Sequence, residues 1–138
     1  MKKTTVLSIL FVAMIMIVAS CKKSDSAHTS VGTKFPRMAQ FVLYSDKDFS
    51  NDNSVVTIKL SIERSINDIL WDSVLQPMRV KDIPKLAEAL TVEKYVPGND
   101  QSLVKVGFHY TIENVGNSSH MDPFEPGETF KIVRFNFQ

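Results

Sequence analysis

The sequence is short of cysteine, because Cys21 is the only one among 138 residues. An internal disulfide bond is therefore excluded, although small exported domains often rely on them. The chain also lacks an excess of charge of one sign, with 16 basic and 15 acidic side chains. Because the basic residues are scattered rather than clustered, we expect no nucleic-acid partner.

Long hydrophobic runs are missing as well. The longest covers residues 6–18, which are 13 positions interrupted only by Ser8. As a helix this run would reach about 20 Å, whereas the hydrocarbon core of a bilayer is about 30 Å thick. We therefore expect no stable transmembrane span here.

Catalytic and cofactor motifs are also absent. The sequence contains no glycine-rich phosphate loop, no His-Glu-x-x-His, no Cys-x-x-Cys and no Gly-x-Ser-x-Gly. Each of these motifs places groups that hold phosphate, bind a metal or attack a carbonyl carbon. We therefore expect no cofactor and no enzymatic activity.

The N-terminus has the layout of a secretory signal peptide. The positive start MKK precedes the apolar run 6–18, and small residues follow it up to Ser20. These are the three regions that an export signal needs. Removing residues 1–20 takes away two lysines and no acidic residue, so the remaining chain carries a formal charge of −1.

The residues around Cys21 refine this prediction. The tetrapeptide Val18-Ala19-Ser20-Cys21 resembles the lipobox of bacterial lipoproteins. The resemblance implies that the Cys21 thiol carries a diacylglycerol, that cleavage makes this residue the first one, and that its amino group takes an acyl chain such as palmitate. A thiolate is a good nucleophile for such a transfer. Two or three acyl chains would anchor the protein firmly, and we expect the outer membrane of a Gram-negative envelope, on either of its sides.

The segment after the cysteine is strongly polar. Residues 22–34, KKSDSAHTSVGTK, contain only Ala27 and Val31 as apolar side chains. Such a composition does not repay the entropy lost on ordering. We predict a flexible tether that spans roughly 20 Å. The predicted organisation is a signal peptide over 1–20, a lipidated N-terminus and tether over 21–34, and a single domain over 35–138.

From Phe35 onward the dominant hydrophobic period is two, which is the period of a half-buried strand. The clearest strands cover 55–63 and 104–112, where apolar and polar residues alternate. Both are long and lack proline, so we expect them at the centre of a sheet. Weaker patterns predict five more strands, over residues 38–44, 69–75, 78–80, 91–96 and 129–137.

Turn and helix signals complete the predicted fold. Pro97 and Gly98 favour a type II turn that joins the strand over 91–96 to the next one as a hairpin. A bulge near Ile132 would reconcile the two parities of apolar residues in the last strand. Only 83–90 has a helical pattern, for two turns at most. About seven short strands predict an all-β fold, an immunoglobulin-like or fibronectin-like β-sandwich, with a small closed barrel as the alternative.

Two polar segments carry candidate functional residues. In the first, three aspartates form a weak candidate for a Ca²⁺ site, and the favoured interpretation is a solvated turn. In the second, residues 116–128, we predict a long loop at an end of the sandwich and the leading candidate for a binding site. The aspartates are Asp46, Asp48 and Asp52, and the candidate binding residues are His120, Asp122, Phe124 and Glu125.

Two ring side chains have alternative interpretations. Trp71, the only tryptophan, is expected in the core, with stacking on a sugar as the alternative. His109 shares the polar parity of its strand and is expected to be exposed. Together these patterns predict a lipid-anchored, non-enzymatic binding or accessory module for a glycan or an envelope protein. The alternative is a structural subunit of an outer-membrane complex with no ligand of its own.

Overall fold

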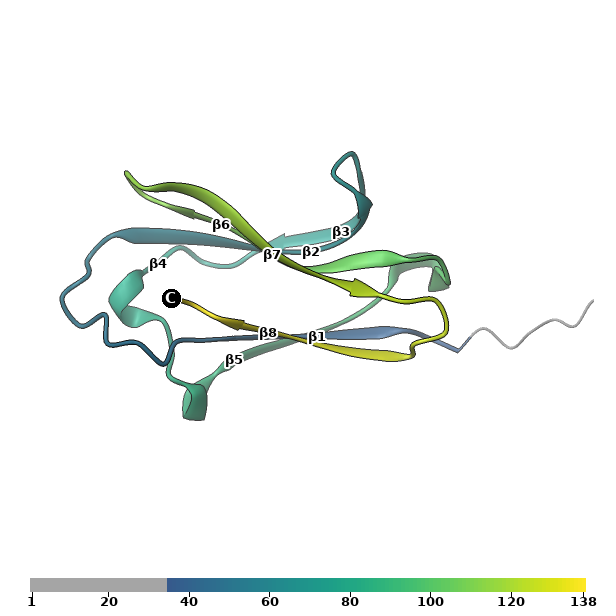
Figure 1. Cartoon of the computed structure of the whole chain (residues 1–138), viewed down its shortest axis with the longest axis horizontal. Coiled ribbons are helices and arrows are strands. Elements are labelled where there is room, and N and C mark those ends of the chain that lie inside the picture. Colours follow the sequence, from purple (N-terminus) through teal and green to yellow (C-terminus); the bar gives the residue numbers. More distant parts are fainter. Residues whose placement is uncertain (1–34) are drawn as a thin grey trace, which may run out of the picture. The chain divides into compact units, whose positions relative to one another are not determined.

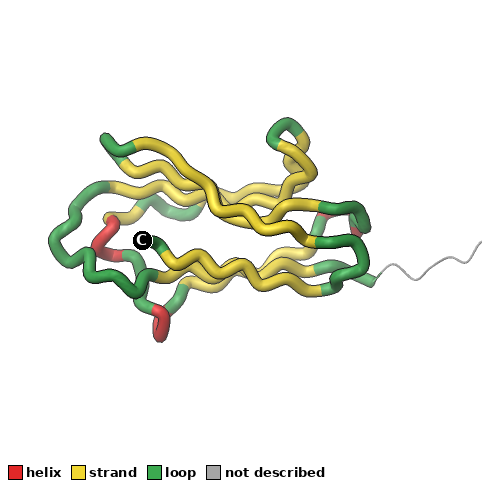
Figure 2. The backbone as a smooth tube through the Cα atoms, in the orientation of Figure 1, coloured by secondary structure: helices red, strands yellow, loops and turns green. Residues whose placement is uncertain are grey.

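The computed structural model describes residues 35–138, which form two packed β-sheets (Figures 1 and 2). The predictions for the signal peptide, for Cys21 and for the tether fall on residues 1–34 and lie outside this part. The strands are β1 (Met38–Tyr44), β2 (Val55–Ser65), β3 (Asp68–Val74), β4 (Met78–Arg79), β5 (Leu90–Tyr95), β6 (Val104–Ile112), β7 (Gly116–Phe124) and β8 (Phe130–Asn136).

The larger sheet has the order β3-β2-β6-β7, with the short β4 paired to the start of β2. The smaller sheet has the order β5-β1-β8, in which β1 and β8 are parallel. The all-β sandwich is therefore confirmed, as is the central position of β2 and β6.

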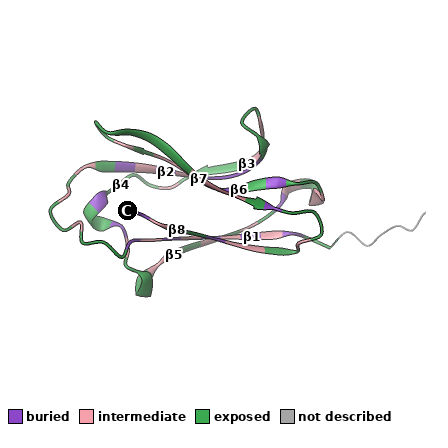
Figure 3. Ribbon diagram, in the orientation of Figure 1, coloured by how far each residue is buried: buried purple, intermediate pink, exposed green. Residues whose placement is uncertain are grey.

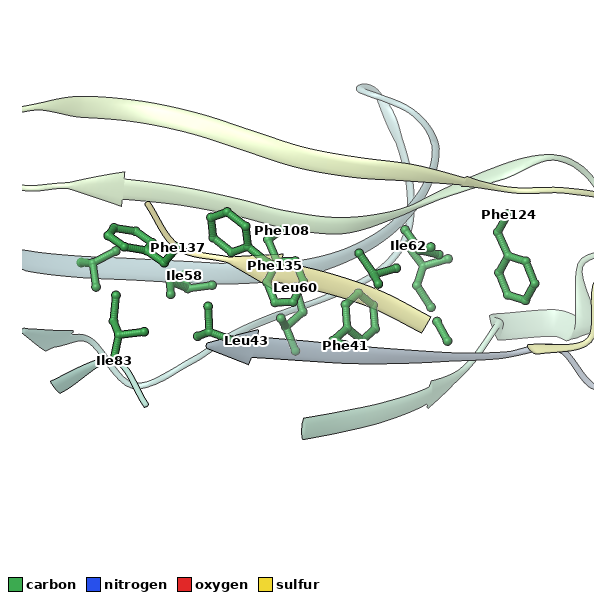
Figure 4. Close-up of a cluster of buried hydrophobic side chains, with 14 of the residues drawn as sticks. Phe41, Leu43, Ile58, Leu60, Ile62, Ile83, Phe108, Phe124, Phe135 and Phe137 are labelled. Carbon is green, nitrogen blue, oxygen red and sulfur yellow. The ribbon is translucent and has the colours of Figure 1, made fainter. Parts of the chain in front are cut away.

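The core lies between the two sheets and follows from the period of two. Alternate residues of β1 point inward, so Phe41 and Leu43 are buried while their neighbours are half-exposed. Figure 4 shows these side chains meeting Leu60 and Phe108 from the larger sheet. The Phe108 ring packs edge-on against Phe41, with centroids 5.7 Å apart, and lies 5.3 Å from the Phe135 ring. In Figure 3 buried segments line the gap between the sheets, and exposed ones lie mainly in loops and at strand edges.

One strand was not predicted. Residues 116–124, expected to form a loop, are β7, which pairs with β6 from Val104↔Phe124 to Ile112↔Gly116. The sequence there is polar and contains a proline, so its strand propensity is low. The strand forms because β6 offers it an uninterrupted line of backbone hydrogen-bonding groups. Gly107 permits this pairing, since a Cβ at this position would collide with the backbone carbonyl oxygen of His120.

Three local predictions were wrong. Strands β5 and β6 lie in different sheets, so the turn at Pro97–Asn99 crosses between the sheets and closes no hairpin, although Gly98 does adopt a positive φ of 64°. Strand β8 pairs with β1 without a bulge, because Ile132 points outward at the sheet edge while Val133 is buried. The expected helix is reduced to a single 3-10 turn at Leu86–Glu88, after another at Val80–Asp82.

Arg37 holds together one end of the sandwich. Its side chain is fully buried, with 1% of the residue exposed. The guanidinium donates hydrogen bonds of 2.6–3.0 Å to five backbone carbonyl oxygens, those of Asp100, Ser102, Phe124, Glu125 and Glu128. All five of its N–H groups are therefore used. Burial lowers the pKa of Arg37, against the raising effect of the Asp100 and Glu128 carboxylates.

The sandwich has two ends, and the Arg37 contacts mark one of them. The entry end contains Phe35, where the described chain begins, and the loops 96–103 and 125–129. The far end contains the loops 45–54 and 80–89 together with the β6–β7 turn.

Candidate functional site

A shallow polar groove crosses the outer face of the larger sheet, toward the far end. Two successive rungs on this face place Thr57 beside Thr111, and Lys59 beside His109, on β2 and β6. Strand β7 extends the same two rungs with Asn117 and Ser119. These six side chains line a groove with a volume of about 610 Å³, bordered by Val74 of β3.

The groove holds hydrogen-bonding groups and a cation. Lys59 Nζ lies 3.6 Å from an Asp72 carboxylate oxygen on β3. Because the groups stand on three neighbouring strands of one sheet, their spacing is fixed by the pairing register. The groove therefore offers a rigid set of donors and acceptors, with no large apolar side chain at its centre.

His109 lies beside a buried carboxylate. Glu63 is only 4% exposed, and its Oε2 lies 3.5 Å from His109 Nε2. The same Oε2 accepts a hydrogen bond from the Ser61 hydroxyl at 3.3 Å. His109 Nε2 is itself buried and has no hydrogen bond. The imidazole was expected to be exposed, and the structure shows it half-buried beside Glu63.

The Glu63 cluster is unlike a nucleophile site. The Ser61 hydroxyl donates to the Glu63 carboxylate rather than to the imidazole, so the cluster does not have the serine–histidine arrangement of a typical nucleophile. Within residues 35–138, no three His, Cys, Asp or Glu side chains come together to hold a metal ion.

A second, more apolar groove lies at the far end, between the edges of the two sheets. Its volume is about 810 Å³. Its lining includes Val55, Leu75, Pro77, Met78 and Leu90, and its charged rim consists of Arg79 and Asp82. Met78, Leu75 and Leu90 also pack against the core, so the apolar lining of this groove is continuous with the core.

The residues of the predicted binding loop lie on β7 and just beyond its end. Phe124 is fully buried beneath the Arg37 guanidinium, 4.1 Å from its ring centroid. His120 faces the core side of β7 and stacks on Phe135, with centroids 5.5 Å apart. His120 Nε2 and an Asp122 oxygen are 4.0 Å apart. Glu125 lies past the end of the strand, and its N–H bonds the Glu128 carboxylate.

The aspartates of the loop 45–54 serve as turn residues. Asp48 accepts the Ser50 N–H, and Asp52 accepts the Ser54 N–H. These backbone hydrogen bonds lower the pKa of both carboxyl groups. The third member, Asp46, instead accepts a hydrogen bond from the Asn136 side chain at 3.0 Å.

Trp71 packs against the core, as expected. Its ring lies 5.9 Å from that of Phe41 and is half-buried. Lys94 Nζ covers it at 5.2 Å from the ring centroid. The sugar-stacking alternative therefore gains no support from the position of this ring.

Sequence reasoning missed the polar groove, although one signal was present. The polar parity of β2 and β6 places Thr57, Lys59, His109 and Thr111 on one face, but only the register shows that these residues share two rungs.

Comparisons of the chain with protein-family models, curated proteins and solved structures gave no match. No helix in the described part of the chain has the length and hydropathy of a membrane span.

Proposed function

We propose that the protein is a lipid-anchored, non-enzymatic binding module of a Gram-negative envelope, and that its polar groove binds a glycan. The observation that carries this proposal is the pair of rungs in which six polar side chains face outward from three strands. The volume of about 610 Å³ lies within the usual range for small-ligand sites. The anchor is inferred from the lipobox resemblance around Cys21.

The residues of this groove are better suited to binding a glycan than to binding another protein. The centres of protein interfaces are enriched in aromatic and arginine side chains that fill pockets. The six groove residues instead carry three hydroxyl groups, one amide, one imidazole and one ammonium group. Hydroxyl-rich ligands satisfy such groups one by one, and the Lys59 ammonium group favours a ligand that also bears a carboxylate. A uronic-acid oligosaccharide is the chemical class that fits best.

Thermal shifts with oligosaccharides test the groove. Uronic-acid oligosaccharides should raise the Tm by several degrees at concentrations well above Kd, because the ligand binds only the native state. Asn117→Ala and Thr111→Val should remove the shift. Thr91→Val is the matched control, because Thr91 is an exposed threonine of the other sheet. If no oligosaccharide shifts the Tm, the proposal fails. Co-purification with envelope proteins would then favour the structural-subunit alternative.

A separate experiment tests the anchor. Cys21→Ser removes the thiol that would take the lipid, so the full chain should remain uncleaved or become soluble. Mass spectrometry of the mature N-terminus of the unsubstituted protein gives the direct answer. An unmodified Cys21 thiol there would end the lipoprotein interpretation.

A further inference from the structure

Four large apolar side chains are exposed around the entry end, and we call them the collar. Phe35 is 65% exposed, Tyr95 60%, Leu103 50% and Phe130 44%. Phe35 lies two positions before Arg37, and Leu103 follows Ser102, whose carbonyl oxygen Arg37 contacts. Tyr95 precedes Val96, whose N–H bonds the Arg37 carbonyl oxygen, and Phe130 follows Thr129, whose carbonyl oxygen accepts the Met38 N–H. Tyr95 and Phe130 flank Met38 on one rung of the smaller sheet, so their side chains share its outer face. We propose that the collar docks on the membrane surface, an inference that rests on the proposed lipid anchor at Cys21.

The kind of side chain distinguishes the collar from the other exposed apolar residues. Within residues 35–138, the three large aromatic side chains that are exposed all belong to it. The other exposed large apolar residues are aliphatic. Ile66 and Ile69 lie at the β2–β3 turn, also toward the entry end, whereas Val74 borders the polar groove and Val55, Leu86 and Val115 lie at the far end. Aromatic side chains concentrate where proteins meet the polar boundary of a bilayer, because their rings tolerate both phases.

Charge near the collar fits an anionic lipid surface. Three lysines lie within two sequence positions of a collar residue, and these are Lys34, Lys105 and Lys131; Lys94, next to Tyr95, instead covers the Trp71 ring. Several neighbouring acids are engaged inside the fold. Asp100 is paired with Arg64 at 2.7 Å, and the Glu128 carboxylate accepts the Glu125 N–H. Lysines beside exposed rings can reach headgroup phosphates while the rings contact the acyl boundary.

Chain length brings the collar to the membrane. Phe35 is 14 positions after Cys21, and a coil of that length spans roughly 20 Å. A lipid on Cys21 would therefore keep the collar close to the bilayer at a high effective concentration. Under that condition a few exposed rings suffice for docking, although they would bind only weakly without the anchor.

Fluorescence quenching tests the docking. The full chain, processed by a Gram-negative host, is reconstituted in phosphatidylethanolamine and phosphatidylglycerol vesicles that carry a spin-labelled lipid. A fluorophore is attached at Leu103→Cys or at Phe130→Cys. Leu86→Cys and Val115→Cys at the far end are matched controls, because both residues are also exposed and apolar. We expect the lipid to quench the two collar labels and to leave the two control labels unquenched.

A second comparison separates docking from mere proximity. With the label at Leu103→Cys, the pair Tyr95→Ser and Phe130→Ser should reduce quenching to the level of the far-end controls. Thr91→Ser, on the same sheet face, should leave it unchanged. Equal loss with Thr91→Ser would overturn the assignment to the collar.

The outcomes also distinguish this proposal from the anchor itself. Vesicle flotation reports the anchor, and quenching reports the docking. Equal quenching at both ends, or none in a chain that floats with the vesicles, overturns docking and leaves the anchor intact. A chain that does not float refutes the anchor and, with it, the docking. Collar labels that are shielded from aqueous iodide but not quenched by the lipid would assign this surface to a second copy or another protein, which also overturns the proposal.

Discussion

Replacing Arg37 with methionine would remove all five hydrogen bonds that hold the entry end together. The acceptors are backbone carbonyls in two loops, at 100–102 and 124–128, and the arginine they surround is only 1% exposed. The carbonyls would therefore lose their partner at a site with little access for water. A buried polar group left without its partner typically costs about 1–3 kcal/mol, so several unpaired carbonyls that partly regain water together cost about 3–5 kcal/mol. We expect Arg37→Met to lower the free energy of unfolding by that amount, a large share of the about 5–15 kcal/mol of a typical domain.

A conservative variant separates charge from geometry. Arg37→Lys keeps the charge but offers three donors, so at least two carbonyls stay unpaired and a loss of about 2–3 kcal/mol is expected. Arg79→Met is the control, because Arg79 is exposed and its side chain contacts Asn53 at 3.3 Å; its effect should stay within about 0.5 kcal/mol. Urea unfolding of the fragment 30–138, followed by Trp71 fluorescence, measures all three. A loss below about 1 kcal/mol in Arg37→Met would refute the reasoning.

Three further predictions concern the core, one carboxylate and the polar loop. Phe108→Ala should lower the free energy of unfolding by about 3–5 kcal/mol, because it leaves a cavity between the sheets. The pKa of Asp100 is lowered from 3.8 to about 2 by hydrogen bonds from Ser102 and by Arg64. Its stabilising effect is therefore complete above pH 3.8 and is lost as the pH falls toward 2, so urea midpoints should decline over that range less in Asp100→Asn than in the wild type. Millimolar Ca²⁺ should leave the Tm unchanged, because the Asp48 carboxylate already accepts a backbone hydrogen bond within its turn.

Each of these has a clear contrary result. A change below about 1 kcal/mol in Phe108→Ala, equal to that of the exposed Phe130→Ala, would mean that the inner face of β6 is assigned wrongly. An unaltered acid dependence in Asp100→Asn would show that this carboxylate does not set it. A calcium-specific rise in Tm that Asp48→Ala abolishes would establish a calcium site.

The sequence was sufficient where burial alone determines the strand. In β6 apolar and polar residues alternate, and β1 has a largely apolar sequence; the predicted bounds 104–112 and 38–44 match the structure. It was insufficient for β7, which carries few residues that favour strands and exists because β6 pairs with it. Strand β5 shows the opposite failure. The positive φ of Gly98 agrees with the prediction, but whether the following strand joins the same sheet depends on contacts far along the chain.

Long-range contacts also explain why the segment 116–124 was expected to be a loop and is a strand. Arg37 meets carbonyls that lie 63 to 91 positions away, and no local pattern announces such a partner. The segment 116–128 looked like a binding loop because it is polar and rich in ligand-type side chains. Pairing with β6 instead turned Phe124 under Arg37 and His120 toward Phe135. The polar groove lies on β2 and β6, the two strands with the clearest sequence pattern.

The positions of the groove and the collar make the two proposals compatible. The groove occupies the rungs of Thr57 and Lys59, close to the far end of β2, whereas the collar surrounds the entry end. A sandwich docked by its collar would therefore hold the groove away from the bilayer. A uronic-acid oligosaccharide should then bind equally well in vesicles and in detergent. Weaker binding on vesicles alone would show that the membrane covers the groove, and would contradict docking through the collar even if both surfaces bind their ligands separately.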